Sequence, residues 1–288
     1  MNFVYHVLIM SGIYMILCLS LNVMVGYGGL FNIGHAAFYG IGAYVAAILT
    51  VKMSVSFPLD LLLSGVITGV FGVIVGFPAL RLKGDYLALC TFGFGVVMHT
   101  IFNNWVAVTH GPQGIVGVPR PSIFSLPLNS LPSYLLLVAI VVSICFFILA
   151  RVVDSPFGKS LMAIREDQMA AVAAGKNIAQ IKIIVFCVGA FFAGIAGNLY
   201  VHYISIADPS AFATDESFLV FTMVVFGGMA SMRGSVLGAF VLVIFPELLR
   251  FIGIPSFYAA QIRRMLFGFL LVLVILKRPQ GLLGKYRF

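Results

Sequence analysis

The sequence predicts an all-α integral membrane protein, a polytopic bundle of about eight to ten helical crossings. Of its 288 residues, 61% are hydrophobic and only 9% are charged, whereas soluble domains are roughly half apolar and a quarter charged. The apolar residues gather into long runs that short polar segments separate. Since one helical crossing takes about 20 residues plus its connection, a chain of this length forms one polytopic domain, residues 1–288.

Five apolar runs precede a polar segment at residues 154–182, and four follow it. No Lys or Arg precedes the first run and no small-residue cleavage pattern follows it, so we expect a retained span and not a signal peptide. The predicted spans are 3–25, 28–50, 58–80, 86–106, 131–150, 183–204, 218–229, 236–251 and 265–276.

The distribution of charge predicts how the chain is oriented. Cytoplasmic loops are rich in Lys and Arg, which places segment 154–182 and the basic C-terminal tail in the cytoplasm and, after five crossings, the N-terminus outside. Arg81 and Lys83 then lie inside, and the acidic loop 204–216 lies outside. Orientation therefore explains the net charge of +8 better than nucleic acid does, because no soluble basic surface with interleaved aromatic residues is visible.

Glycines interrupt two of the predicted spans. Six glycines fall within residues 26–42, and the run 218–229 is too short for a plain lipid-facing helix. We expect broken or re-entrant helices that neighbouring helices shield from lipid. The alternative is that Gly40, Gly42 and Ala43 only let two helices approach closely. Both interpretations place this region inside the bundle.

A faint internal repeat is also visible. Gly28-Gly29 running into residues 40–44 is echoed by Gly227-Gly228 running into residues 234–240. Transporters are often built from such repeats, and paired glycine-interrupted segments indicate a translocation path. The abundance of glycine alone can also produce the match by chance.

The polar segment 154–182 predicts an amphipathic surface helix. Ser155 followed by Pro156 is typical of a helix start, with a hydroxyl cap and a proline in the first turn. Gly175 can end this helix, and Asn177 with Gln180 resembles a reciprocal cap of the next span. One apolar stripe recurs at steps of three or four residues, and Lys159, Glu166 and Asp167 lie largely elsewhere. The stripe consists of Phe157, Leu161, Ile164, Ala171 and Gly175.

We call segment 154–182, a surface helix followed by a tight break before the next span, the elbow. An elbow with an apolar face can fill a groove on a partner and transmit the partner's movement into the attached spans. The alternative is a helix that lies on the lipid surface. Residues 158–167 with Ala170, Ala171 and Gly175 resemble the cytoplasmic coupling loop of ABC-transporter permeases, and in particular the LivM type of branched-chain amino acid permease. Met169 stands where the general motif has glutamate. Similar motifs follow in order at 26–44, 80–88, 103–105, 109–115, 119–121, 191–194, 227–231 and 278–284.

The resemblance implies an ABC importer permease in the bacterial inner membrane, working with a LivH-type permease, two cytoplasmic ATPase subunits of the LivG and LivF type, and an extracytoplasmic solute-binding protein. ATP and Mg would bind to the ATPase subunits, because residues 158–160 match only the end of a phosphate-binding loop. Leu, Ile and Val are the expected solutes, with urea, short amides or other amino acids as alternatives. The implied coupling residues are Ser155, Pro156, Phe157, Gly158, Leu161, Ile164, Arg165, Glu166, Asp167, Ala170, Ala171 and Gly175.

Few polar residues lie in the spans, so the translocation path is sought among them. Asn32 and His35 are candidates, with hydrogen-bonded packing as the alternative; the glycines Gly28, Gly34, Gly227 and Gly228 complete the candidate set. A stand-alone secondary transporter or channel would need charged relay residues within its spans. A membrane enzyme would need clustered catalytic side chains, whereas the five histidines are scattered. The four cysteines have no metal-ligand spacing, and no metal site is expected.

Overall fold

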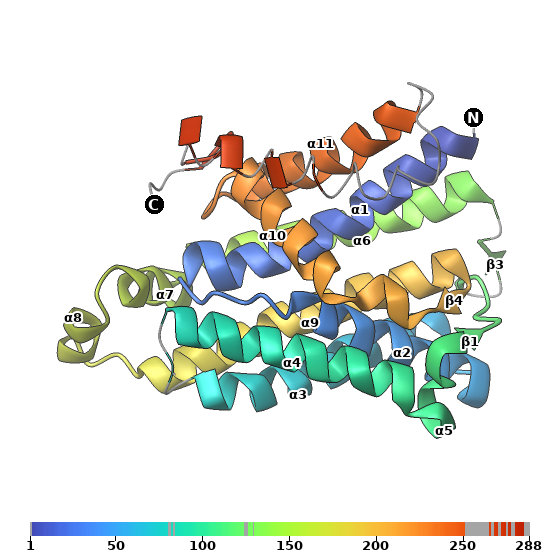
Figure 1. The fold of residues 1–288 in the computed structure, drawn as a ribbon, viewed down its shortest axis with the longest axis horizontal. Helices are drawn as coiled ribbons and strands as arrows, with labels where there is room; N and C mark the ends of the chain where they lie inside the picture. Colours follow the sequence, from blue (N-terminus) through green and yellow to red (C-terminus); the bar gives the residue numbers. More distant parts are fainter. Residues whose placement is uncertain are drawn as a thin grey trace.

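Long apolar helices lie side by side between two ends of the bundle, one formed by α7 and α8 and the other by short strands (Figure 1). The computed structural model describes residues 2–79, 82, 84–123, 126–128, 130–250, 265, 268–269, 272–274, 276–277 and 280–284. The helices are α1 (Asn2–Asn22), α2 (His35–Met53), α3 (Phe57–Ala79), α4 (Asp85–Asn104), α5 (Val106–Thr109), α6 (Leu131–Asp154), α7 (Pro156–Glu166), α8 (Gln168–Ala173), α9 (Ile178–Ile204), α10 (Thr214–Gly227) and α11 (Met232–Arg250).

A first re-entrant segment follows α1. The π-helix η1 (Val23–Tyr27) extends α1, and residues 28–34 then leave helical structure. Gly29 has a φ of +63°, which glycine adopts without steric cost. α2 begins inside the bundle, because a side chain at Gly34 would collide with the Thr91 carbonyl of α4. The glycine-rich stretch is therefore re-entrant, as predicted, but its helix begins at His35 and not at residue 28.

A second re-entrant segment follows α9. Strand β4 (Ile206–Ala207) pairs antiparallel with β1 (Ile115–Val116), and the 3-10 helix η3 (Pro209–Phe212) leads into α10. The Ala36 backbone N–H donates to Ser217 Oγ at 2.9 Å, so the first turns of α2 and α10 meet. The predicted end of the external loop 204–216 is wrong. Asp215 and Glu216 belong to the first turn of α10, because the segment before them folds inward.

Helices from the N-terminal part of the chain pack against helices from the C-terminal part. α1 packs against α10 and α11, whereas α9 packs against α2 and α3. Each triplet, α1–α3 and α9–α11, contains a long helix, a re-entrant segment and a helix that starts inside the bundle. The glycine echo does not follow these triplets, since Gly28 opens a re-entrant segment and Gly228 lies in the turn between α10 and α11.

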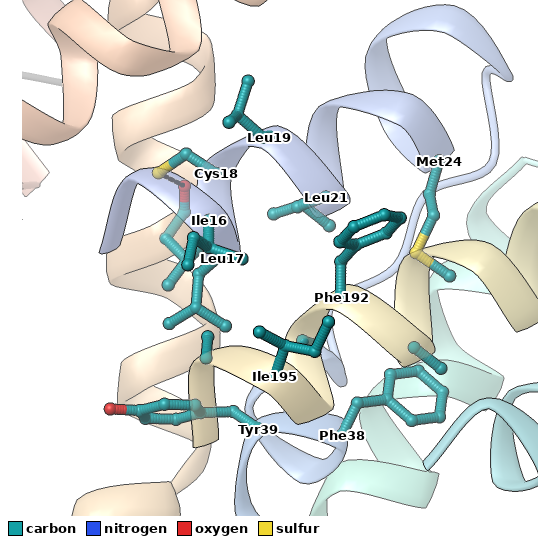
Figure 2. Packing of buried hydrophobic residues seen from close by; sticks show 14 of the residues in the cluster. Ile16, Leu17, Cys18, Leu19, Leu21, Met24, Phe38, Tyr39, Phe192 and Ile195 are labelled. Atoms are coloured by element: carbon teal, nitrogen blue, oxygen red, sulfur yellow. Dashed lines mark hydrogen bonds between the residues drawn. The ribbon is translucent and has the colours of Figure 1, made fainter. Parts of the chain in front are cut away.

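The core lies between α1, α9 and α2. Figure 2 shows Leu17 and Leu21 of α1 facing Phe192 and Ile195 of α9. Lipid is as apolar as these side chains, so close packing, and not removal from water, holds the helices together. A side chain at Gly42 of α2 would collide with the α9 backbone, which confirms the close-approach interpretation for that glycine.

Six helices of the described part are long and apolar enough to cross a membrane. They are α1 with η1, α2, α3, α4, α6 and α9, and α11 contains a shorter apolar helix, Met232–Phe245. Within the predicted ninth span, 265–276, the structure describes residues 265, 268–269, 272–274 and 276. Arg81, Lys83 and the last bases of the tail lie outside the described residues. A second strand pair, β2 (Ser122–Ile123) with β3 (Leu126–Pro127), lies near the N-terminal end of α6.

Candidate functional site

The start of α7 follows the sequence prediction. Ser155 has extended backbone angles, its hydroxyl accepts from the Gly158 N–H at 3.3 Å, and Pro156 occupies the first turn. The hydroxyl therefore satisfies one of the free amides of the helix start. Gly158 is required sterically, since a side chain there would collide with the Val153 backbone. These residues fix the angle at which the chain turns from α6 into α7.

The predicted single helix is divided at Asp167. This residue leaves helical geometry with φ −148° and ψ 108°, and its carboxylate accepts from the N–H groups of Met169 and Ala170 at 2.8 and 3.1 Å. Asp167 thus caps a separate helix, α8, because its side chain competes for the backbone amides. Gly175 ends this helix with a φ of +74°, as predicted, and Asn177 caps α9 through the Gln180 N–H.

The inner face of α7 contacts the first re-entrant segment. Leu161 and Ile164 are buried, and Leu161 lies directly over Gly28, where a Cβ would be 3.2 Å from its side chain. Arg165 donates from Nη1 to the Gly26 carbonyl and covers Gly29 with its aliphatic stem. The absence of side chains at these glycines lets α7 contact the backbone that turns back into the bundle.

Asn22, the last residue of α1 before η1, bonds to the turn between α10 and α11. Its Oδ1 accepts from the Ala230 N–H at 3.0 Å, and its Nδ2 donates to Ser231 O and Ser235 Oγ at 3.0 and 2.7 Å. All of Asn22 is buried. A continuous set of contacts therefore runs from α7 through η1 to the start of α11.

A cavity of about 480 Å³ opens beside this connection. Its walls come from α6, from Tyr27 of η1 and from the turn between α10 and α11. Asp154, where the polar segment begins, and Arg233, at the start of α11, both lie on its edge and are exposed. α7 contacts both α6 and η1, two of the elements that form these walls.

The outer surface of α8 is apolar and exposed. Met169 is 75% exposed and Val172 is 53% exposed, and Ala170 is exposed beside them, whereas Ala171 packs inward. Glu166 and Asp167 are also exposed at the break between the two helices. The apolar stripe, which was expected to fill a groove on a partner, instead buries Leu161, Ile164 and Ala171 inside this chain. Gly175, the last residue of the stripe, is exposed.

Asn32 and His35 form one buried network with α1. The Gly34 N–H donates to Asn32 Oδ1 at 3.1 Å, which orients the amide so that Nδ2 faces His35 Nδ1 at 3.2 Å. His35 Nε2 lies 2.8 Å from Ser20 Oγ, which itself donates to the Leu17 carbonyl. Nδ1 thus accepts and Nε2–H donates, the pattern of a neutral imidazole. Both Asn32 and His35 have no exposed surface in this conformation.

The four candidate path glycines lie in different places. Gly28 is under α7, and Gly34 is beside α4 in the bundle interior. Gly227 and Gly228 lie in the α10–α11 turn, where the Leu282 and Leu283 N–H groups donate to the Phe226 and Gly227 carbonyls. The structure thus brings Gly34 together with Asn32 and His35 and separates them from the pair Gly227 and Gly228.

Sequence reasoning missed a buried charged cluster between α3 and α9. Asp60 Oδ2 lies 2.9 Å from His202 Nε2 and accepts from Asn198 Nδ2 at 2.5 Å. His202 Nδ1 lies 2.7 Å from the Pro119 carbonyl. One proton between Asp60 Oδ2 and His202 Nε2 and a second on His202 Nδ1, which faces the Pro119 carbonyl, satisfy all of these contacts. The sequence feature that could have revealed this cluster is the acidic residue inside the predicted span 58–80, since such residues are costly in a membrane.

The fold and these contacts define a class: a multi-pass α-helical membrane protein with a helical elbow that projects from one end of the bundle. A family model described as "Branched-chain amino acid transport system / permease component" matches residues 3–275, and the chain belongs to this family. The resemblance given by the sequence motifs is thereby confirmed.

Relatives match along nearly the whole chain. It is 36% identical over 301 residues to the high-affinity branched-chain amino acid transport system permease protein LivM of Salmonella typhimurium, covering 96% of this chain and 69% of that protein. It is 26% identical to the probable LivM of Methanocaldococcus jannaschii, covering 97% and 92%, and 23% identical to LivH of Escherichia coli, covering 94% and 91%. No solved structure gives a significant match.

Proposed function

We propose that this chain is a permease subunit that imports branched-chain amino acids across the bacterial cytoplasmic membrane, driven by ATP hydrolysis on separate subunits. Its family and its similarity to LivM support the solute class. The observation that carries the proposal is the α7–α8 elbow, whose inner face contacts the first re-entrant segment while its outer face presents Met169 and Val172.

The partners follow from the two faces of the molecule. One of two ATPase subunits that bind ATP and Mg²⁺ docks on the elbow, and segment 154–182 and the C-terminus then lie in the cytoplasm. A second permease of the LivH type lies beside this chain; the similarity to LivH over 94% of the chain supports a pair of like subunits. The solute-binding protein then delivers its cargo at the opposite end, beside β1 and β4 (Figure 1).

The mechanism is a mechanical one. Closure of the ATPase pair on nucleotide presses on α7, and Arg165 and Leu161 transmit the shift to Gly26 and Gly28. Asn22 passes it on to the α10–α11 turn. The first re-entrant segment and the α10–α11 turn are thus biased together between two arrangements, and the differential binding of nucleotide supplies the free energy.

The test is uptake by proteoliposomes that contain this chain, its co-purifying permease and ATPase subunits, and the loaded binding protein. We expect ATP-dependent uptake of leucine, isoleucine and valine but not of urea or acetamide. Arg165→Ala should reduce uptake at least tenfold with assembly intact, and Lys159→Ala, on the exposed side of α7, should not. Uptake of urea would refute the solute class, and uptake without the ATPase subunits would show a stand-alone transporter.

A further inference from the structure

The first turn of α10 places a carboxylate halfway along the bundle. Glu216 is half-buried and accepts a hydrogen bond at Oε1 from the hydroxyl of Tyr14, which lies near the middle of α1. Thr214 lies against Gly95, in the middle of α4. Glu216 is therefore far from both ends of the membrane-spanning helices, where ionisable residues mark a solute or ion pathway by default.

A second and independent feature lies beside this carboxylate. The Tyr39 side chain is 1% exposed, yet its hydroxyl has no hydrogen-bond partner among the described residues. Figure 2 shows the hydroxyl end of Tyr39 pointing away from the other labelled side chains. Tyr39 lies one turn after Ala36, whose backbone N–H donates to Ser217, the residue that follows Glu216. A buried hydroxyl without a partner is costly, so a partner that arrives with a ligand would complete its hydrogen bonding.

The walls of this region are aromatic. The Tyr39 ring centroid lies 5.4 Å from that of Tyr200 and 5.1 Å from that of Phe212, and the Tyr200 and Phe212 centroids are 5.8 Å apart. Aromatic faces carry negative electrostatic potential and attract cations. A carboxylate, two hydroxyl oxygens and three rings are a set of groups that favours a positively charged ligand.

We propose that Glu216, with the hydroxyls of Tyr14 and Tyr39, binds the ammonium group of the transported amino acid midway through the permease. A primary ammonium offers three donors and no acceptor, which matches a site made of acceptor oxygens. The substrate carboxylate would be repelled by Glu216, so the amino acid is oriented as well as held. This inference rests on the proposed function and names the group of the solute that the permease itself recognises.

Such a site recognises what all α-amino acids share. Leucine, isoleucine and valine differ only beyond the ammonium group, so discrimination among them falls to the binding protein. The elbow then has a direct route to the site: α7 contacts the segment that leads into α2, and Tyr39 lies in the second turn of α2.

The test uses the complete transporter in proteoliposomes and measures leucine uptake and ATP hydrolysis side by side. Glu216→Gln keeps the shape of the side chain and removes the charge, and we expect leucine imported per ATP hydrolysed to fall at least tenfold while hydrolysis still responds to the loaded binding protein. Glu216→Asp, which keeps a carboxylate, should restore part of the uptake. Asp215→Asn is the matched control, because it removes the same charge from the same helical turn at an exposed position.

Three results would overturn the site. Equal losses in Glu216→Gln and Asp215→Asn would mean that both acids only stabilise the start of α10. Normal leucine import per ATP in Glu216→Gln would overturn the site while leaving the proposed function intact, whereas no leucine uptake by the unmodified transporter would refute the proposed function itself. If Glu216→Gln fails to assemble, Tyr39→Phe decides: we expect a two- to fivefold loss of uptake, and an unchanged rate contradicts the proposal.

Discussion

Replacing Asp60 by leucine should destabilise the bundle by about 3–5 kcal/mol, because it breaks a buried ion pair and leaves His202 without its carboxylate partner. Asp60 and His202 are 0% and 1% exposed, and the lost carboxylate oxygen is bonded to both His202 and Asn198. The Pro119 carbonyl can satisfy only the other ring nitrogen of His202. The substitution therefore removes the one negative charge that faces this ring in the described contacts.

The measurement is equilibrium unfolding of the purified protein in detergent, followed by circular dichroism. Ser64→Ala is the control in the same cluster; it removes hydrogen bonds to Asp60 and Asn198 but no charge, and should cost about 1–2 kcal/mol. The double change Asp60→Leu with His202→Phe should recover most of the loss, since apolar replacement of a whole buried pair is often close to neutral. A loss of less than about 1 kcal/mol in Asp60→Leu would refute the charged-pair interpretation.

Three further predictions concern the elbow and the buried network. Gly29→Ala and Gly84→Ala both place a side chain at positive φ, which costs about 1–2 kcal/mol of stability each. A Cβ at Gly29 would lie 2.9 Å from Arg165 Cγ, whereas a Cβ at Gly84 would meet open space. Only Gly29→Ala should therefore lower ATP-driven uptake. Gly175→Val should abolish uptake with membrane insertion intact, whereas Gly175→Asn, which tolerates the left-handed region, should retain it; equal uptake in both would contradict a geometric role. His35→Ala should lower the free energy of unfolding by about 1–3 kcal/mol, because Ser20 and Asn32 lose their partner; a changed solute selectivity would instead place His35 on the path.

Local chemistry made much of the elbow predictable from the sequence. Ser155 with Pro156, Gly175, and Asn177 with Gln180 each act on backbone groups a few residues away, and all have the predicted capping role or a close form of it. The break at Asp167 was not predictable in the same way. An acidic residue on the exposed side of a surface helix looks the same in sequence whether it continues the helix or caps a new one.

Long-range placement was the part that the sequence could not supply. Asp60 and His202 are 142 residues apart, and no local pattern shows that α3 and α9 bring them together. From the sequence, Glu216 was assigned to an external acidic loop. The segment before it folds inward because it packs against α2 and α4, and the sequence does not reveal that packing. Hydropathy identifies the segments that lie in the membrane. The position along the bundle at which a short helix begins depends on the helices packed around it.

The central proposal is that α7 and α8 dock on an ATPase, and cysteine cross-linking of the assembled transporter tests it most directly. In a chain whose four native cysteines are replaced, single cysteines are placed along residues 157–175. We expect cross-links to the ATPase at the exposed positions Met169 and Val172, and none at the buried positions Leu161 and Ile164. Equal cross-linking at exposed and buried positions, or none at any position in an actively transporting complex, would contradict docking through this elbow.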